Sequence, residues 1–107
     1  MTTLWQPWRL GDLVVPNRIV RSATWEGLAD EQGRPLPRLE ALLARIAAGG
    51  AGLVVVGFSF VDPAGKALTG QTGIHADDLL PGLAALARAI AREGARSAIQ
   101  IGHCGPQ

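Results

Sequence analysis

Twice in this sequence, a helix-like run ends in glycine and leads directly into a run of aliphatic residues. The first passage leads through Gly49–Gly52 into Leu53–Val56, and the second leads through Gly94 into Ser97–Ile101. Glycine often follows the last turn of a helix, because it adopts the left-handed conformation at little cost. An unbroken apolar strand after such a helix is typical of a parallel sheet. The pattern therefore predicts repeating β-α units.

Two amphipathic helices are expected between the strands. Pro37 suits the first position of a helix, where its missing N–H does no harm. The apolar face of this first helix follows the helical spacing at Leu39, Leu42, Leu43, Ile46 and Ala47.

The second helix is predicted to begin at an Asp77 N-cap and to end before Gly94. Its expected buried face is Leu83, Leu86, Ala87, Ile90 and Ala91. A short hairpin over residues 8–15 and a first sheet strand over residues 18–22 precede both helices. A turn at 62–65 is expected inside a long connection over residues 57–76.

Size and charge limit the class of protein. The 107 residues provide about three strands and two helices, whereas a closed (β/α)8 barrel needs about 250 residues. A formal net charge of +1 offers no electrostatic reason to expect nucleic acid or an anionic membrane as partner. A single cysteine, Cys104, and the lack of a signal peptide or a membrane-length apolar run favour a cytoplasmic protein.

The carboxyl ends of the three predicted sheet strands are the expected location of chemistry, because ligands bind there in parallel α/β sheets. These ends are Ser22–Trp25, Gly57–Ser59 and Gln100–His103. The amide of Gln100 offers both a donor and an acceptor, which suits the edge of a heterocycle. A buried Gln100 that bonds only a neighbouring backbone is an equally good interpretation of the spacing.

Five blocks in order along the chain resemble the old yellow enzyme family of FMN-dependent NAD(P)H oxidoreductases. They are Pro16–Val20, Gly50–Val56, Asp62–Lys66, Gly73–Ile74 and Gln100–Gly105. The resemblance implies the N-terminal portion of a (β/α)8 TIM barrel, with about three β/α units after a hairpin. Residues 1–107 would then form one partial FMN-binding domain, without the later strands.

By resemblance, six residues would contact the flavin. The backbone of Ser22, Ala23 and Thr24 would lie against the isoalloxazine ring, and Gln100 would bond its pyrimidine edge. Trp25 stands where many members have a Thr or Cys that tunes the flavin, and Phe58 stands where a small residue commonly abuts the ring.

The resemblance also places Gly102 beside the substrate, where some members carry a bulky aromatic residue. It assigns no catalytic residue to this chain, because the family's substrate-orienting His/Asn or His/His pair, proton-donating tyrosine and phosphate-binding glycines lie on later strands. We therefore expect the isolated 107 residues to bind FMN weakly or not at all.

Two other pairs of polar residues are not expected to form a metal or acid/base site, and His103 is expected to pack or to line a ligand. His103 and Cys104 are neighbours at a strand end, where adjacent side chains point in opposite directions, so a metal or nucleophile site is disfavoured. Asp77 and Asp78 at a helix start are more typical of caps than of an acid/base pair. No metal site is predicted.

The implied reaction transfers hydride from NAD(P)H to FMN and then to an activated alkene or a similar small molecule. A homo-oligomer of the complete protein is compatible with this prediction. Two alternatives remain open at this point. The chain is a non-catalytic assembly or interaction module that uses an exposed sheet edge, or it belongs to a similar barrel that binds another ligand, such as a phosphosugar.

Overall fold

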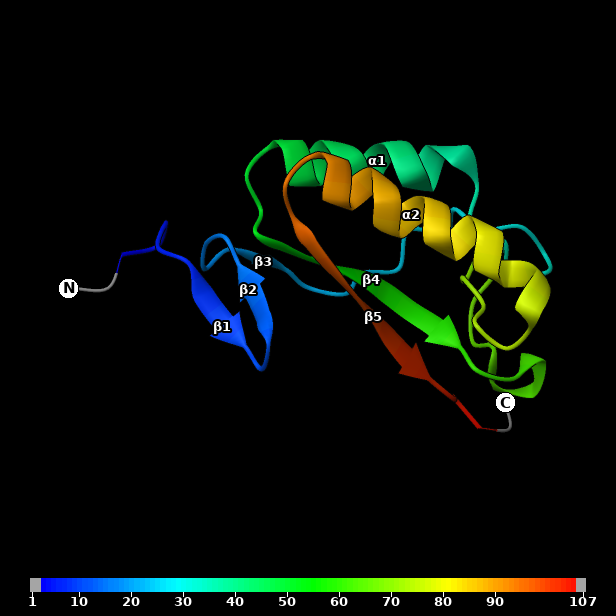
Figure 1. The fold of residues 1–107 in the computed structure, drawn as a ribbon. Coiled ribbons are helices and arrows are strands. Elements are labelled where there is room, and N and C mark those ends of the chain that lie inside the picture. Colours follow the sequence, from blue (N-terminus) through cyan, green and yellow to red (C-terminus); the bar gives the residue numbers. More distant parts are fainter. Residues whose placement is uncertain (1–2, 106–107) are drawn as a thin grey trace.

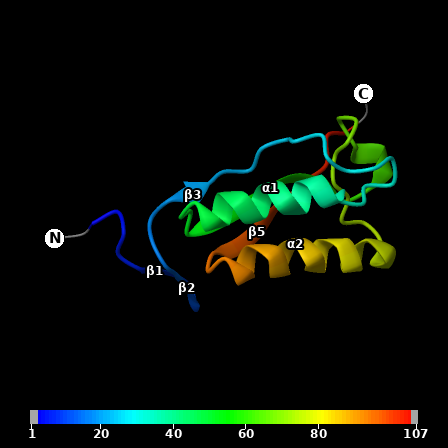
Figure 2. The ribbon, with the colours of Figure 1, turned by 90° about the horizontal axis from the view of Figure 1, so that it is seen from above.

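Two helices lie side by side on one face of a three-stranded parallel sheet in the computed structural model, which describes residues 3–105 (Figures 1 and 2). The sheet has the order β3-β4-β5. Its strands are β3 (Val20–Arg21), β4 (Leu53–Phe60) and β5 (Arg96–Gly102), and the helices are α1 (Pro37–Ala48) and α2 (Leu80–Arg92). The predicted β-α-β-α-β order is confirmed.

The predicted hairpin is also confirmed. Strands β1 (Trp8–Leu10) and β2 (Leu13–Val15) pair antiparallel, and Gly11 turns between them with a φ of 61°. The hairpin lies beside the end of the sheet at which β4 and β5 begin (Figure 1). The guanidinium of Arg96 fixes it there by donating a 3.0 Å hydrogen bond to the carbonyl of Val14.

The core fills the space between the helices and the sheet. Val54 and Val56 point toward the helices, so the residues between and after them face the opposite side of β4. The buried core residues are Leu39, Leu43, Ala47, Val54, Val56, Leu86, Ile90 and Ala95. Each Leu, Ile or Val side chain removed from water here contributes about 1.5–3 kcal/mol.

The second helix differs from its prediction. Asp77 does not cap it, because a 3-10 turn over Asp77–Leu79 leads into α2 at Leu80. Ala87 and Ala91 are exposed, whereas Ala89 is buried with Leu86 and Ile90. The helix contacts α1 as well as the sheet, and this double contact turns its buried stripe toward Ala89.

Strand β4 is longer than the aliphatic run suggests. The predicted connection from residue 57 was wrong at its start, because the strand continues to Phe60. Phe60 forms a parallel bridge with Gly73, and its N–H donates to the carbonyl of Thr72 at 3.0 Å. The turn predicted at 62–65 is confirmed, since the Gly65 N–H donates to the Asp62 carbonyl at 2.8 Å.

Among the described residues, neither helix combines the length and hydropathy required to cross a bilayer.

Asn17 ties the hairpin to the sheet. Its side-chain amide donates to the carbonyl of Gly50 at 2.7 Å, and its side-chain oxygen accepts the N–H of Ile19 at 3.0 Å. Its own carbonyl accepts the indole N–H of Trp8 at 2.5 Å. One half-buried side chain therefore connects the start of β3 with the glycine turn that precedes β4.

We predict that Asn17→Ala lowers the free energy of unfolding by about 1–3 kcal/mol, because the Gly50 carbonyl and the Ile19 N–H lose their partner. Urea-induced unfolding measures the change. Asp12→Ala is the matched control, since Asp12 is exposed in the hairpin turn and should change stability by less than about 0.5 kcal/mol. Equal stability of the Asn17 variant and the parent chain would contradict this role.

Candidate functional site

A bulge interrupts the pairing of β4 with β5 at the predicted ligand-binding edge. Between the paired residues on either side, β4 contributes Gly57 and Phe58 where β5 contributes only Gln100. Bulges redirect side chains and are common next to active sites. Two of the predicted flavin contacts, Phe58 and Gln100, therefore lie next to each other. The sequence signal for the bulge is a glycine inside an aliphatic strand.

The segment that follows β3 packs directly on this bulge. A Cβ atom added to Gly57 would lie 2.3 Å from the backbone nitrogen and oxygen of Thr24, so only glycine permits the approach. At the end of β5, a Cβ atom added to Gly102 would lie 3.7 Å from the Phe58 ring of β4. All three predicted strand ends consequently form one continuous surface.

Several residues on this surface leave polar groups accessible. Ser22, Thr24 and Gln100 are exposed, while Ala23, Phe58 and Gly102 are half-buried. The Thr24 hydroxyl donates to the Ser22 carbonyl at 3.2 Å. Gln100 lies on β5, the edge strand of the sheet, and its side chain is exposed. A side-chain amide of this kind can both donate and accept hydrogen bonds.

Trp25 contacts the loop that follows β4. Its indole N–H donates to the carbonyl of Thr69 at 3.2 Å, and its ring packs over Gly27. The residue remains 48% exposed. The indole N–H thus joins two loops of the protein, while the exposed part of the ring borders the candidate site.

The enclosed space behind this surface is small. A cavity of about 10 Å³ lies below the segment, with a lining that includes Arg21, Thr24, Trp25, Gly57 and Phe58. Such a volume holds about one water molecule. The cavity is therefore too small to enclose a cofactor of the size of a flavin, and Ser22, Thr24 and Gln100 are exposed on the open side of the surface.

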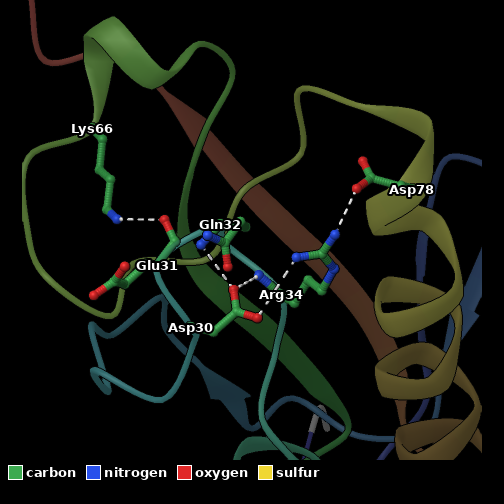
Figure 3. Close-up of polar contacts among 6 residues, drawn as sticks. All are labelled: Asp30, Glu31, Gln32, Arg34, Lys66 and Asp78. Carbon is green, nitrogen blue, oxygen red and sulfur yellow. Dashed lines mark hydrogen bonds and ion pairs between the residues drawn. The ribbon is translucent and has the colours of Figure 1, made fainter.

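Polar contacts stabilise the loop after β3 and connect it with the segments after β4 (Figure 3). The Arg34 guanidinium pairs with Asp78 at 2.8 Å, and the Lys66 ammonium donates to the carbonyl of Glu31 at 3.2 Å. The Asp30 carboxylate accepts the N–H groups of Gln32 and Arg34, each at 2.9 Å. The Asp30 contacts lie within the loop after β3, whereas the Arg34–Asp78 and Lys66–Glu31 contacts join this loop to the segments after β4. The sequence did not indicate these two contacts, because each connects residues far apart in the chain.

The other candidate side chains have structural surroundings. His75 stacks on Phe60 with ring centroids 5.0 Å apart. The His103 ring packs against Gly65, and its Nδ1 accepts the N–H of Gly105 at 3.0 Å. Cys104 is exposed. Within residues 3–105, no group of three or more His, Cys, Asp or Glu side chains is arranged to hold a metal ion.

The chain belongs to the NADH:flavin oxidoreductase / NADH oxidase family, whose model matches residues 3–107. It is 38% identical to the 4,4'-dithiodibutanoate disulfide reductase of Rhodococcus erythropolis, over 96% of this chain and 25% of that protein. A solved 2-naphthoyl-CoA reductase complexed with 2-naphthoyl-CoA has a TM-score of 0.90 and 38% identity, covering 94% of this chain and 15% of the other.

The fold extends to more distant structures. The old yellow enzyme homologue from Zymomonas mobilis has a TM-score of 0.87 at 22% identity, over 95% of this chain and 28% of that one. These matches confirm the predicted family and the predicted N-terminal portion of a (β/α)8 barrel. The chain spans about a quarter of the length of the curated relative described above.

We predict that Gly57→Ala destabilises the protein by more than about 1 kcal/mol, since the new methyl group would overlap the Thr24 backbone and displace the segment. Gly102→Ala is the control, because its methyl group would meet only the Phe58 ring at an ordinary contact distance. Thermal unfolding of both variants checks the difference. A Gly57 variant as stable as the Gly102 variant would show that the close approach does not constrain the fold.

Proposed function

We propose that this chain is the N-terminal part of an FMN-dependent NAD(P)H oxidoreductase of the ene-reductase type. The supporting observation is the continuous surface made by the three strand ends, on which Thr24 packs against Gly57 and Phe58 lies beside Gly102. Membership of a flavin oxidoreductase family supports the choice of a flavin as the ligand.

The residues present fit a planar heterocycle. Along this segment Ser22 and Thr24 are exposed and Ala23 is half-buried, which leaves a side that a flat ring can approach. Gln100 has an exposed side-chain amide, which can accept from and donate to the two kinds of polar atom on a pyrimidine edge. Trp25 and Phe58 supply apolar ring surface at its border.

We assign Gly102 to the part of the surface that would face the substrate. With no side chain at this position, the substrate side is roomier than with an aromatic residue. When bound, FMN would supply hydride transfer between NAD(P)H and an activated alkene or similar acceptor. This chain's own contribution is to bind and orient the ring.

The proposal assigns no catalytic residue to residues 1–107, which would form one partial domain of a cytoplasmic enzyme. The chain contains no tyrosine, so a tyrosine proton donor would come from outside it. We propose that flavin phosphate binding likewise uses residues outside this segment. On this basis the 107 residues alone bind FMN weakly or not at all.

Titration of FMN fluorescence tests the proposal in the longer protein and in the 107-residue chain. Quenching by the longer protein, with little or none by the short chain, is the expected result. A longer protein that is colourless and does not quench FMN would overturn the flavin assignment and favour a barrel with another ligand.

We predict that Gln100→Leu in the longer protein weakens FMN binding by about tenfold or more, because the leucine cannot replace the lost hydrogen bonds. Gln32→Leu is the matched control, since Gln32 lies in the loop between β3 and α1 and its hydrogen bond to Asp30 is donated by the backbone N–H, which the substitution keeps. Fluorescence titration gives both dissociation constants. Equal constants for the two variants would remove Gln100 from the flavin site.

A further inference from the structure

Two oppositely charged residues bracket the segment that we assign to the flavin. Arg21 ends β3, and Glu26 follows the segment Ser22–Trp25. The Arg21 guanidinium donates a hydrogen bond to the Glu26 carboxylate and forms an ion pair with it. The pair is largely shielded, since only 16% of the arginine and 24% of the glutamate side chain are exposed. Segment Ser22–Trp25 is therefore a short loop closed by an ion pair.

The pair lies beneath the segment, on the helix side of the sheet. Arg21 and Glu26 line the small cavity together with Leu39 and Leu43 of α1. Arg21 pairs with Val54, which points toward the helices, so the Arg21 side chain lies on the same side of the sheet. The exposed residues Ser22 and Thr24 carry the ligand side of the segment. Arg21 and Glu26 consequently act on a bound ring only through the backbone between them.

Glu26 is the group that holds the guanidinium in place. The Nη1 atom of Arg21 is buried and makes no hydrogen bond with any described residue. The other terminal nitrogen of the guanidinium, Nη2, donates the hydrogen bond to Glu26. Removal of the carboxylate would leave a shielded positive charge without its partner, which proteins tolerate poorly. The arginine side chain and the end of β3 would then move.

Two other contacts hold the same segment from different directions. Gly57 fixes the backbone of Thr24 against β4, and the Thr69 carbonyl holds the Trp25 indole. Neither contact connects the two ends of the segment. The ion pair does connect them, because its members precede the first and follow the last of the four residues.

From this arrangement we infer that Arg21 and Glu26 are positioning residues, whose ion pair holds Ser22–Trp25 in the conformation that binds the flavin ring. The inference rests on the proposed flavin site. It attributes the shape of that site to an ion pair that lies on the side of the sheet opposite the ligand.

The test uses Glu26→Gln in the longer protein, with FMN affinity, the visible absorbance spectrum of the bound flavin and its midpoint potential as readouts. Gln keeps the size of the side chain and removes its charge. We expect FMN affinity to fall by about tenfold, the effect of losing one charge-assisted hydrogen bond. The spectrum and potential should shift, because the ring rests on a displaced backbone. Arg21→Lys keeps the charge and should retain affinity, spectrum and potential.

Asp12→Asn is the matched control, because it removes the charge from an exposed ion pair with Arg9 in the hairpin, away from the candidate site. It should leave FMN affinity, spectrum and potential unchanged. A Glu26→Gln protein with parental affinity, spectrum and potential would overturn the inference. If the parental longer protein does not bind FMN, the proposed function itself fails, and this outcome is distinct from the first.

A second variant covers the case in which Glu26→Gln fails to fold. The double substitution Arg21→Met with Glu26→Leu removes both charges, and such apolar replacements often preserve folding. A folded double variant with weakened FMN binding and a shifted spectrum supports positioning by the ion pair. A folded double variant with parental binding, or one that does not fold, would show that the pair serves stability alone and would overturn the inference.

Discussion

The close contact between the Thr24 backbone and the Cα atom of Gly57 is the constraint on which the rest of the site depends. No side chain fits between these two chain segments. The contact brings the end of β3 onto β4 at the position where β4 bulges opposite Gln100. Without it, the residues after β3 and those of β5 would not share one surface.

Two ion pairs restrain the segments that follow the strands. The Arg21–Glu26 pair closes the segment on the helix side, and the Arg34–Asp78 pair joins the outer loops. These contacts restrain the shape of the loops that carry the candidate site. Loops carry the site, while the sheet and α1 provide the rigid support.

Local patterns predicted much of the fold. Pro37 and the helical spacing that follows it correctly indicated α1, and the glycine–aliphatic passages correctly indicated β4 and β5. The start of α2 was harder to predict from the sequence, because aspartate is a common N-cap residue, but Asp77 lies in a 3-10 turn. A choice between a cap and a turn depends on hydrogen bonds to the surrounding chain, which a local pattern does not contain.

The sequence by itself determined the repeating β-α order, the family, and which strand ends would carry the candidate site. These properties follow from residue periodicity and from short motifs, which are local in the chain. Only the tertiary structure decided that Gly57 and Phe58 together face Gln100, that Trp25 bonds Thr69, and that Arg21 pairs with Glu26 beneath the site. Pairing register and side-chain direction decide such contacts, and both are set by packing between segments distant in sequence.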